Sequence, residues 1–258
     1  MKITEDRFFA EIFGHEVFKV EINPEELNLE GGGGPAISAL KQHAARQPRA
    51  FYYAKVDTGR IEVVQRLSAA GFYAVEVNVI FGLETKSKKE SPVTQAANVC
   101  EIAPARAGQH QEVLEIAATT FRFSRFHLDP LIPDAVANRI KHDWIGNYLQ
   151  KKRGEQLWVA AVQGRPAGFL AVLASKDNGK EVRTIDLIGV GRDFKRQGIG
   201  LALTEFFIKH YWDRCQYLQV GTQIANFPSL GLYQKAGFQI AKTAYVMHLH
   251  VRDGRPLS

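Results

Sequence analysis

The apolar positions between residues 182 and 210 follow first the pattern of a buried strand and then that of a helix. Aliphatic residues dominate residues 182–190, which predicts a strand, and apolar residues recur at helical spacing over residues 199–210, which predicts a helix. A basic loop joins the two, and glycines flank it at Gly189, Gly191, Gly198 and Gly200. Free N–H groups and the helix dipole would both point at this loop, so the pattern predicts an anion-binding site.

Helical and strand-like runs alternate along the rest of the chain, which predicts an α/β (α+β) fold. Strand-like runs occupy residues 17–22, 51–56, 72–83, 156–162, 167–174, 217–222 and 238–251. Helical runs occupy residues 37–46, 61–70, 109–121, 135–149 and 226–235. Residues 124–133 contain two prolines, which predicts a loop, and we interpret the aromatic cluster before residue 17 as packing around the first strand.

A segment near the C-terminus repeats the pattern of one near the N-terminus. Residues 66–84 and residues 232–250 both run from a helix end through Ala-Gly-Phe into a long strand. We therefore interpret the N-terminal part as a smaller, degenerate copy of part of the C-terminal fold. We expect an N-terminal α/β domain over residues 1–84, a polar linker over residues 85–98 and a C-terminal domain over residues 99–258.

Charge and cysteine usage narrow the classes of partner. The formal net charge is +6, but the basic residues are scattered, so nucleic acid is not favoured and a phosphate-rich small molecule explains the charge equally well. Cys100 and Cys215 have neither pairing nor metal-ligand spacing, so we expect a reducing cytoplasm and no metal. The sequence has no apolar run of membrane-spanning length and no signal-peptide core at its start, so we expect no membrane partner.

The loop after the central strand matches one of three phosphate-binding patterns. Phe194 stands where the dinucleotide pattern G-x-G-x-x-G requires its third glycine, and the chain has no G-x-x-x-x-G-K-[ST]. Residues 195–200 instead follow [R/Q]-x-x-G-x-[G/A], with lysine in the first place. This loop resembles the acyl-CoA loop of the GCN5-related N-acetyltransferase (GNAT) family, whose fold has the order of elements predicted after residue 100. The resemblance implies the fold of that family, a mixed central sheet flanked by helices. For the loop alone, a generic strand-to-helix turn is the alternative.

The resemblance implies acetyl-CoA as co-substrate and a set of residues that bind it. In the family, the central strand splays and its main-chain N–H groups, here those of Ile188, Gly189 and Val190, polarise the thioester carbonyl. Gly189 is compatible with a β-bulge there. Asn226 would contact the pantetheine arm, although it also suits a plain helix N-cap. The pyrophosphate would be cradled by Lys195, Arg196, Gln197, Gly198, Ile199 and Gly200.

The resemblance also implies that Tyr233 is the general acid of an N-acetyltransferase. In the family, the tyrosine of Tyr-x-x-x-Gly-Phe protonates the departing CoA sulfur, and a phenol with a pKa of about 10 can do this within hydrogen-bond reach of a thiolate. Asn226 and Tyr233 are two helical turns apart and so share one face of the helix. A half-buried structural tyrosine is the alternative. Leu67 holds the matching place in the N-terminal repeat, which therefore lacks this acid.

Further motifs resemble those of two-domain GNAT enzymes that acetylate a TDP-linked 4-amino-4,6-dideoxygalactose; they are residues 71–76, 124–126, 220–226 and 242–245. This resemblance implies direct transfer to the amine of a nucleotide-linked amino sugar, with Glu76 as a remote base acting through water. It also implies acceptor contacts from Ser124, Arg125, Phe126 and His127, with His127 as a second base candidate. The alternatives are a solvent-facing Glu76, and loop packing with a surface ion pair for the other four.

Other functions fit the same sequence. A GNAT enzyme could acetylate a protein N-terminus, a polyamine or an antibiotic, because acceptor pockets are built from variable loops. A CoA-binding regulatory module without turnover is the alternative outside enzymes, although Tyr233 and Glu76 argue against it. The N-terminal domain could also mediate a homodimer. An N-acetyltransferase acting on an amino sugar is the leading hypothesis.

Overall fold

The computed structural model describes residues 1–22, 34–85 and 99–257 and divides the chain into two compact units. Unit 1 comprises Met1–Asn78, Arg125–Val136 and Thr243–Ser258, and unit 2 comprises Val79–Ser124 and Ala137–Lys242. The linker expected over residues 85–98 lies outside the described residues except for Thr85. Among the helices of the described ranges, none combines the length and the apolar character that a membrane span requires.

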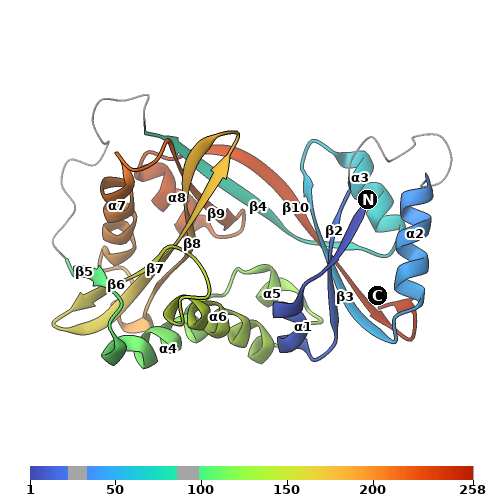
Figure 1. Cartoon of the computed structure of the whole chain (residues 1–258), viewed down its shortest axis with the longest axis horizontal. Coiled ribbons are helices and arrows are strands. Elements are labelled where there is room, and N and C mark those ends of the chain that lie inside the picture. The colour runs from blue at the N-terminus through green and yellow to red at the C-terminus, as the bar shows by residue number, and fades with distance from the viewer. Residues whose placement is uncertain (23–33, 86–98, 258) are drawn as a thin grey trace. The chain divides into compact units, whose positions relative to one another are not determined.

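Unit 1 contains a four-stranded stretch of sheet with helices packed on it (Figure 1). β1 (Lys2–Glu5) is antiparallel to β2 (Glu16–Glu21), which is parallel to β3 (Arg49–Asp57). β3 is antiparallel to β10 (Gln239–Arg252), and the short β11 (Arg255–Pro256) also pairs with β10. The helices of this unit are α1 (Arg7–Phe13), α2 (Gly34–Ala45), α3 (Ile61–Ala69) and α5 (Arg125–Leu128).

The alternation of side chains along β3 and β10 decides which residues share a face of this sheet. Tyr52 belongs to the apolar core formed with α2 and α3, whereas its neighbours Phe51 and Tyr53 point to the opposite face. His248 and His250 are the cross-strand partners of Tyr53 and Phe51, so both histidines lie on that second face. Aromatic side chains of α1 and α5 cover it. The second face is therefore both aromatic and polar.

The N-terminal segment forms more regular structure than its pattern predicts. The aromatic cluster that we expected to pack around the first strand forms α1, between β1 and β2. Asp6 caps this helix by accepting a hydrogen bond from the Phe9 N–H at 3.2 Å, and Gly14 ends it with a φ of 69°. The helix has only 7 residues, so its period is too short to stand out from a run of aromatic residues.

Unit 2 is a mixed sheet with helices on both faces (Figure 1), and it confirms the predicted fold class. Its strands follow the order β4, β9, β8, β7, β6, β5, in which β8 and β9 are parallel and the pairs from β8 to β5 are antiparallel. The strands are β4 (Tyr73–Glu84), β5 (Glu101–Pro104), β6 (Gln156–Val162), β7 (Arg165–Asp177), β8 (Lys180–Val190) and β9 (Tyr217–Gln223). One apolar face packs on α7 (Ile199–Tyr211) and α8 (Phe227–Lys235), and the other packs on α4 (His110–Thr120) and α6 (Asp134–Leu149).

The two units do not follow the expected division into residues 1–84 and 99–258. β4 begins in unit 1 and ends in unit 2, and β10 begins in unit 2 and ends in unit 1. Backbone pairing from Ala244↔Asp57 to Arg252↔Arg49 ties the C-terminal strand to the N-terminal sheet. Arg125–Val136 also belongs to unit 1. Strand pairing over such a long separation leaves no local pattern in the sequence, which is why the sequence-based division differs.

The predicted repeat is present as two helix ends of the same geometry. After α3, the Phe72 N–H donates to the Leu67 C=O at 3.0 Å, and after α8 the Phe238 N–H donates to the Tyr233 C=O at 3.0 Å. The glycine before each phenylalanine has a positive φ, 97° in the first copy and 92° in the second. Both ends are therefore Schellman-type caps, in which glycine adopts the left-handed conformation at low cost.

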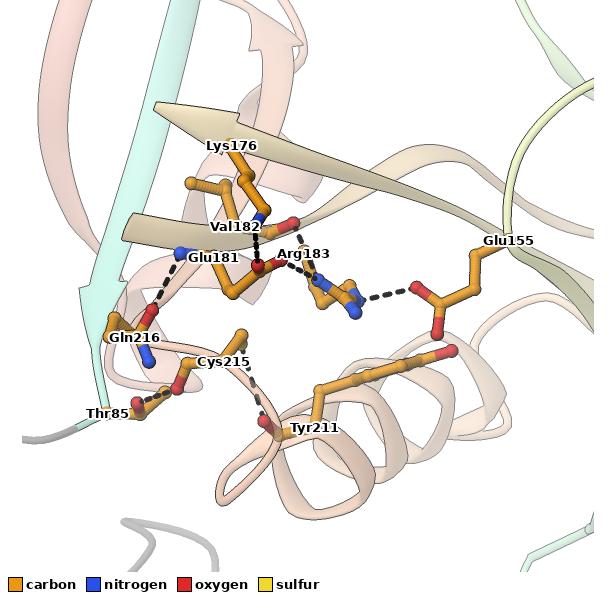
Figure 2. A network of polar contacts seen from close by, with 9 residues as sticks. All are labelled: Thr85, Glu155, Lys176, Glu181, Val182, Arg183, Tyr211, Cys215 and Gln216. Atoms are coloured by element: carbon orange, nitrogen blue, oxygen red, sulfur yellow. Dashed lines mark hydrogen bonds and ion pairs between the residues drawn. The ribbon is translucent and has the colours of Figure 1, made fainter. Parts of the chain in front are cut away.

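A polar network fastens the ends of β4, β8 and β9 together (Figure 2). The Glu181 N–H donates to Gln216 Oε1 at 2.6 Å, and the Gln216 N–H donates back to the Glu181 C=O at 2.9 Å. The Thr85 hydroxyl donates to the Cys215 C=O at 2.5 Å, and Arg183 forms an ion pair with Glu181 at 3.5 Å. The network fixes the register of β8 against β9 at one end of the pair.

Candidate active site

β8 and β9 pair over only part of their length. Their parallel pairing starts at Val182↔Tyr217 and stops after Ile185↔Val220, although both strands continue beyond these residues. β7 stays paired with β8 as far as residue 190, so beyond residue 185 β8 is paired on one edge only among the described strands. The splay expected of the central strand is therefore present. It leaves a strand edge to which an extended ligand can add hydrogen bonds.

The free edge of β8 presents the backbone groups of Ile188 and Val190. The Gly191 N–H donates to the Ala167 C=O of β7 at 2.8 Å, and successive residues of a strand point their backbone groups to opposite edges. Ile188 and Val190 therefore turn their N–H groups away from β7, and Gly189 turns its N–H toward it. Of the three amides expected at the thioester, two have the required direction.

The β-bulge expected near Gly189 lies instead at Asp186. In the β7–β8 register, Ile185 and Leu187 have successive partners, and Asp186 is the extra residue between them. Residue 189 must be glycine for a different reason. A Cβ at this position would lie 2.8 Å from the ring of Phe169, its cross-strand partner. The glycine makes room for an aromatic side chain of the core.

The bulge turns the Asp186 carboxylate toward α6. It accepts hydrogen bonds from Trp144 Nε1 and from the Tyr148 hydroxyl, both at 2.8 Å, and it forms a bidentate pair with Arg153 at 2.8 and 3.1 Å. Burial and the charge of Asp186 raise the pKa of Tyr148. This cluster braces β8 where it leaves β9. The sequence analysis missed Asp186, although the i, i+4 spacing of Trp144 and Tyr148 was a signal for a polar partner.

The loop between β8 and α7 presents unpaired backbone N–H groups. Arg196 and Gly198 have positive φ values of 62° and 82°, and the Ala202 N–H makes the first bond of the helix, to the Gly198 C=O at 2.9 Å. Within the described parts of the chain, the N–H groups of residues 196–201 have no hydrogen-bond partner. Such a row of N–H groups at a helix N-terminus fits an anion like the pyrophosphate of CoA.

The side chains of the same loop are exposed at residues 195–197 and buried at Ile199. Lys195, Arg196 and Gln197 are all exposed, and the Gln197 amide donates to a C=O of the preceding turn at 3.0 Å. Ile199 is buried in the core below α7. A Cβ at Gly200 would be in ordinary contact with a side chain of α8 at 3.8 Å, so the first turn of α7 lies against α8. The predicted phosphate loop therefore stands beside the helix that carries the predicted acid.

Tyr233 lies in the interior of unit 2, deeper than the half-buried position that its alternative interpretation assumed. It is 2% exposed, and its ring centroid is 5.7 Å from that of Phe81 and 6.2 Å from that of Phe238. Burial raises the pKa of its phenol, so the hydroxyl stays protonated at neutral pH. Among the described residues the hydroxyl has no hydrogen-bond partner, so it can donate to a ligand without breaking a bond.

Asn226 begins α8, and its side chain is engaged on both sides. Its Oδ1 accepts a hydrogen bond from the Ser229 N–H at 3.4 Å, and its Nδ2 donates to the Thr222 hydroxyl at 3.2 Å. The structure thus shows the N-cap role that the sequence left open. Contact between Asn226 and the pantetheine arm stays a prediction.

The four residues expected at the acceptor do not form a surface loop. Ser124 is buried in unit 2, whereas Arg125, Phe126 and His127 belong to the one-turn helix α5 of unit 1, inside the segment predicted to be a loop. The Arg125 guanidinium lies over the Tyr53 ring at 4.0 Å and over the Phe126 ring at 4.6 Å. Arg125 is therefore a cation held on aromatic faces, and the surface ion pair expected as its alternative is wrong.

Glu76 lies on the part of β4 that belongs to unit 1, together with Arg125. Its Oε2 is buried, so the solvent-facing interpretation is wrong. Burial lowers the pKa of Arg125, and the phenol of Tyr53 and the carboxylate of Glu76 act in the opposite direction. The structure thus places Glu76, Arg125, Phe126 and His127 in unit 1, and residues 195–200 and Tyr233 in unit 2.

Asp129 of unit 1 is the centre of a buried polar cluster that the sequence analysis missed. Its Oδ2 lies 2.6 Å from His248 Nδ1 and 3.0 Å from His250 Nε2, and its Oδ1 accepts from the Tyr73 hydroxyl at 2.8 Å. Burial alone would raise the pKa of Asp129, but the hydrogen bonds from the two histidines bring it below its ordinary value. The signal was the alternation of two histidines in the last strand, which places both imidazoles on one face.

The same cluster resembles a set of metal ligands, because one ligand atom each from Asp129, His248 and His250 lie within 4.8 Å of one another. Its two short distances, 2.6 and 3.0 Å, are those of hydrogen bonds. Ligands placed tetrahedrally around a zinc ion at about 2.1 Å would stand about 3.4 Å apart. These distances therefore fit hydrogen bonds between the carboxylate and the two imidazoles, and we assign no metal ion to the cluster.

Comparisons with known proteins bear on the fold and on the site. Residues 111–238 match the sequence model of the Acetyltransferase (GNAT) family. The chain is 27% identical over 150 residues to the spore coat polysaccharide biosynthesis protein SpsD of Bacillus subtilis (strain 168). That alignment covers 58% of this chain and 50% of SpsD, so it spans half the length of this relative.

Two solved structures share the fold at low sequence identity. A GCN5-related N-acetyltransferase from Sphaerobacter thermophilus superposes with a TM-score of 0.61 and 13% identity, over 99% of this chain and 78% of that one. A tandem GNAT protein from the clavulanic acid biosynthesis pathway gives a TM-score of 0.56 and 13% identity, over 94% of this chain and 76% of that one. Because residues 111–238 match the family model and the fold agrees with these structures, this part of the chain has the fold of a GNAT acetyltransferase.

Proposed function

We propose that this protein is an acetyl-CoA-dependent N-acetyltransferase that transfers the acetyl group directly to the amine of a nucleotide-linked amino sugar. One arrangement in unit 2 carries the proposal. The free edge of β8, the unpaired amides at the start of α7 and the phenol of Tyr233 belong to one splayed sheet and its flanking helices. An edge for the pantetheine arm, a site for the pyrophosphate and an acid for the sulfur are what transfer from acetyl-CoA needs.

Backbone groups would do most of the work of holding the donor. The N–H groups of residues 196–201 would bind the pyrophosphate, with Lys195 and Arg196 as counter-charges. The pantetheine arm is an extended chain with two amides, and it would pair with the free edge of β8. The N–H of Ile188 or Val190 would then bind the thioester oxygen, where negative charge develops in the transition state.

Tyr233 would act on the leaving sulfur. The amine nitrogen attacks the thioester carbonyl carbon, a C–N bond forms, and the C–S bond breaks. The Tyr233 hydroxyl gives its proton to the CoA thiolate and is reprotonated by the proton that the amine has lost, so the transfer balances. Because burial raises the pKa of Tyr233, the phenol is protonated at the start of each turnover. Its hydrogen bond strengthens as the sulfur becomes negative.

The amine must lose a proton, and Glu76 and His127 are the two candidates to receive it. The Glu76 carboxylate interacts electrostatically with Arg125, where it favours the charged guanidinium. An ionised carboxylate of this kind suits a role in ordering a water that takes the proton, because it is too weak a base to strip an ammonium directly. His127 lies in α5 directly after Phe126 and is the second candidate.

Two observations favour an amino sugar as the acceptor. SpsD, which shares 27% identity with this chain over 150 residues, is named for spore coat polysaccharide biosynthesis. In unit 1, Arg125 lies over aromatic rings and interacts electrostatically with Glu76, and aromatic faces with a few buried polar groups suit a sugar ring. The TDP-linked 4-amino-4,6-dideoxygalactose used by the enzymes that the motifs resemble is the first acceptor to test.

Release of free CoA in the presence of different amines tests this proposal. The panel contains TDP-4-amino-4,6-dideoxygalactose, spermidine and a peptide with a free N-terminus, at a fixed acetyl-CoA concentration. We expect CoA release and an acetylated product with the sugar nucleotide alone. Turnover with spermidine or the peptide alone would assign another acceptor class, and binding of acetyl-CoA without turnover on any amine would favour a regulatory module.

A further inference from the structure

Two buried side-chain nitrogens of unit 1 have no hydrogen-bond partner among the described residues: Arg125 Nη1 and His248 Nε2. Burying a polar group without a partner is unfavourable, so such atoms are rare in native proteins and call for an explanation. They come from different elements: Arg125 belongs to α5, which covers the second face of the unit 1 sheet, and His248 of β10 points to that face. The hydrogen-bonding character of each nitrogen indicates which chemical group could bind to both.

The hydrogen bonds of Asp129 decide the character of His248 Nε2. An ionised carboxylate only accepts hydrogen bonds, so the 2.6 Å contact with Asp129 Oδ2 puts the proton of His248 on Nδ1. Burial lowers the pKa of His248 to about 4, so the imidazole is neutral at pH 7. Nε2 then carries a lone pair, and it is an acceptor without a donor.

Arg125 has the opposite character. A guanidinium only donates hydrogen bonds, and the rings of Tyr53 and Phe126 lie 4.0 and 4.6 Å from its central carbon. The charge of Arg125 also contributes to the lowered pKa of His248, so the two groups are close enough to interact electrostatically. Arg125 Nη1 is therefore a hydrogen-bond donor that lacks an acceptor, and His248 Nε2 is an acceptor that lacks a donor.

We propose that Arg125 and His248 together bind one hydroxyl group of the acceptor sugar. A hydroxyl accepts a hydrogen bond from a guanidinium and donates one to a neutral imidazole nitrogen, so it satisfies both atoms at once. A phosphate oxygen does not fit, because it has no proton for Nε2 and would meet its lone pair. The rings of Phe9, Tyr53 and Phe126 around Arg125 supply apolar surface for a sugar ring.

This inference rests on the proposed function and assigns acceptor recognition to unit 1. It makes Asp129 a positioning residue, because its carboxylate holds the imidazole in the tautomer that accepts at Nε2. It also gives a reason for discrimination among amines. A polyamine has no hydroxyl, so it leaves both buried atoms unsatisfied, and sites built to bind a hydroxyl reject ligands that lack it.

His248→Asn is the test variant. An asparagine amide nitrogen can replace Nδ1 as the donor to Asp129, but it places no acceptor where Nε2 was. His250→Gln is the matched control, because its amide can replace Nε2 as the donor to the same carboxylate oxygen. The acceptors are TDP-4-amino-4,6-dideoxygalactose and its 2-deoxy and 3-deoxy analogues. The readouts are kcat, the KM for the acceptor and the KM for acetyl-CoA.

We expect His248→Asn to raise the acceptor KM by about tenfold or more, with the KM for acetyl-CoA unchanged and His250→Gln within about twofold of wild type. One deoxy analogue should show the same rise with the wild-type protein and no further rise with His248→Asn. If His248→Asn fails to fold, the two analogues with the wild-type protein carry the test.

An unchanged acceptor KM in His248→Asn, or equal KM values for the sugar and both analogues with the wild-type protein, would overturn the inference. Either result would mean that a water satisfies the two atoms, and the proposed function would stand. Failure of the wild-type protein to acetylate this sugar nucleotide would overturn the proposed function and the inference with it.

Discussion

Leu67 and Tyr233 occupy the same place in two helix ends of this protein. Each C=O accepts a hydrogen bond at 3.0 Å from the N–H of a phenylalanine five residues further on, and their side chains are 0% and 2% exposed. Only Tyr233 carries a hydroxyl. The comparison separates what the helix end needs at this place, a large buried side chain, from what acetyl transfer would need, a phenol.

Replacing Tyr233 with phenylalanine removes the proposed acid and leaves the packing. We expect Tyr233→Phe to lower kcat by about 100-fold or more, because general acid catalysis is worth at least that much in such reactions. The thermal midpoint should not fall, since the hydroxyl has no partner among the described residues. Steady-state kinetics and thermal unfolding measure the two effects.

Tyr217→Phe is the matched control for Tyr233→Phe. Tyr217 is a half-buried tyrosine of β9 in the same unit, with its hydroxyl against Gly82. It should keep the wild-type kcat. Equal rates for Tyr233→Phe and Tyr217→Phe would remove the acid role from Tyr233.

The proposed pyrophosphate loop, residues 195–200, can be tested through the backbone conformation of Gly198. Its φ is 82°, and the nearest atom to an added Cβ is 3.8 Å away, so Gly198→Ala strains the backbone without a clash. We expect the dissociation constant for acetyl-CoA to rise about tenfold, because the left-handed conformation costs an alanine about 1 kcal/mol and the N–H groups would shift. Calorimetric titration measures it.

Gly231→Ala in α8 is the control for Gly198→Ala. An added Cβ there meets nothing within 4 Å, and alanine favours the helix. We expect unchanged affinity for acetyl-CoA and equal or higher stability. If both variants bind acetyl-CoA as the wild type does, the loop amides do not hold its pyrophosphate.

The bulge at Asp186 should be a stability determinant. Asp186→Asn leaves Arg153 without its carboxylate, and we expect the free energy of unfolding to fall by about 2 kcal/mol, less than for a fully buried pair because the Arg153 side chain is 36% exposed. Glu21→Gln, which breaks an exposed pair with Lys19, should cost well under about 1 kcal/mol. Urea unfolding of both variants compares them, and equal losses would contradict the bracing role of Asp186.

His248 should make stability depend on pH. Its pKa is about 4 in the folded protein and 6.5 by its ordinary value, so as pH falls through this window the unfolded chain takes up the proton first and stability is lost. Between about pH 7.5 and about pH 5 the loss from this one group should be roughly 2 kcal/mol. Asp129, whose pKa is lowered, loses its contribution only below its ordinary range and so outside this window.

Urea unfolding of the wild-type protein and of His248→Asn at the two pH values measures the contribution of His248 to the pH dependence of stability. The variant should lack the part of the slope that His248 contributes. An identical slope in both proteins would mean that the imidazole is not buried in the neutral form.

The elements of the proposed coenzyme side were predictable because their signals are local. Residues 195–200 and the strand and helix on either side are contiguous, and the repeated Ala-Gly-Phe marks two helix ends by the chemistry of one glycine. The order of elements was therefore readable over most of the chain. The pattern of apolar residues did not predict the β-bulge, because a register shift at Asp186 depends on how β7 and β8 pair.

The proposed acceptor side was less predictable because its residues come together from distant segments. Asp129 and His248 are 119 residues apart in the sequence, and only the pairing of β10 with β3 brings the histidine onto the face covered by α5. Arg125 was expected in a loop that faces the acceptor, since nothing local shows that aromatic rings of α1 and β3 surround it. Alternation indicates which side chains share a face, but not which strands become neighbours.

The most direct test of the central claim is mass spectrometry of a reaction that contains acetyl-CoA and TDP-4-amino-4,6-dideoxygalactose, with the wild-type protein and with Tyr233→Phe. The account predicts that the wild type forms one acetylated sugar nucleotide for each CoA released, and that the variant is about 100-fold slower or more. Equal rates in the two proteins, or no acetylated sugar with the wild type, would contradict it.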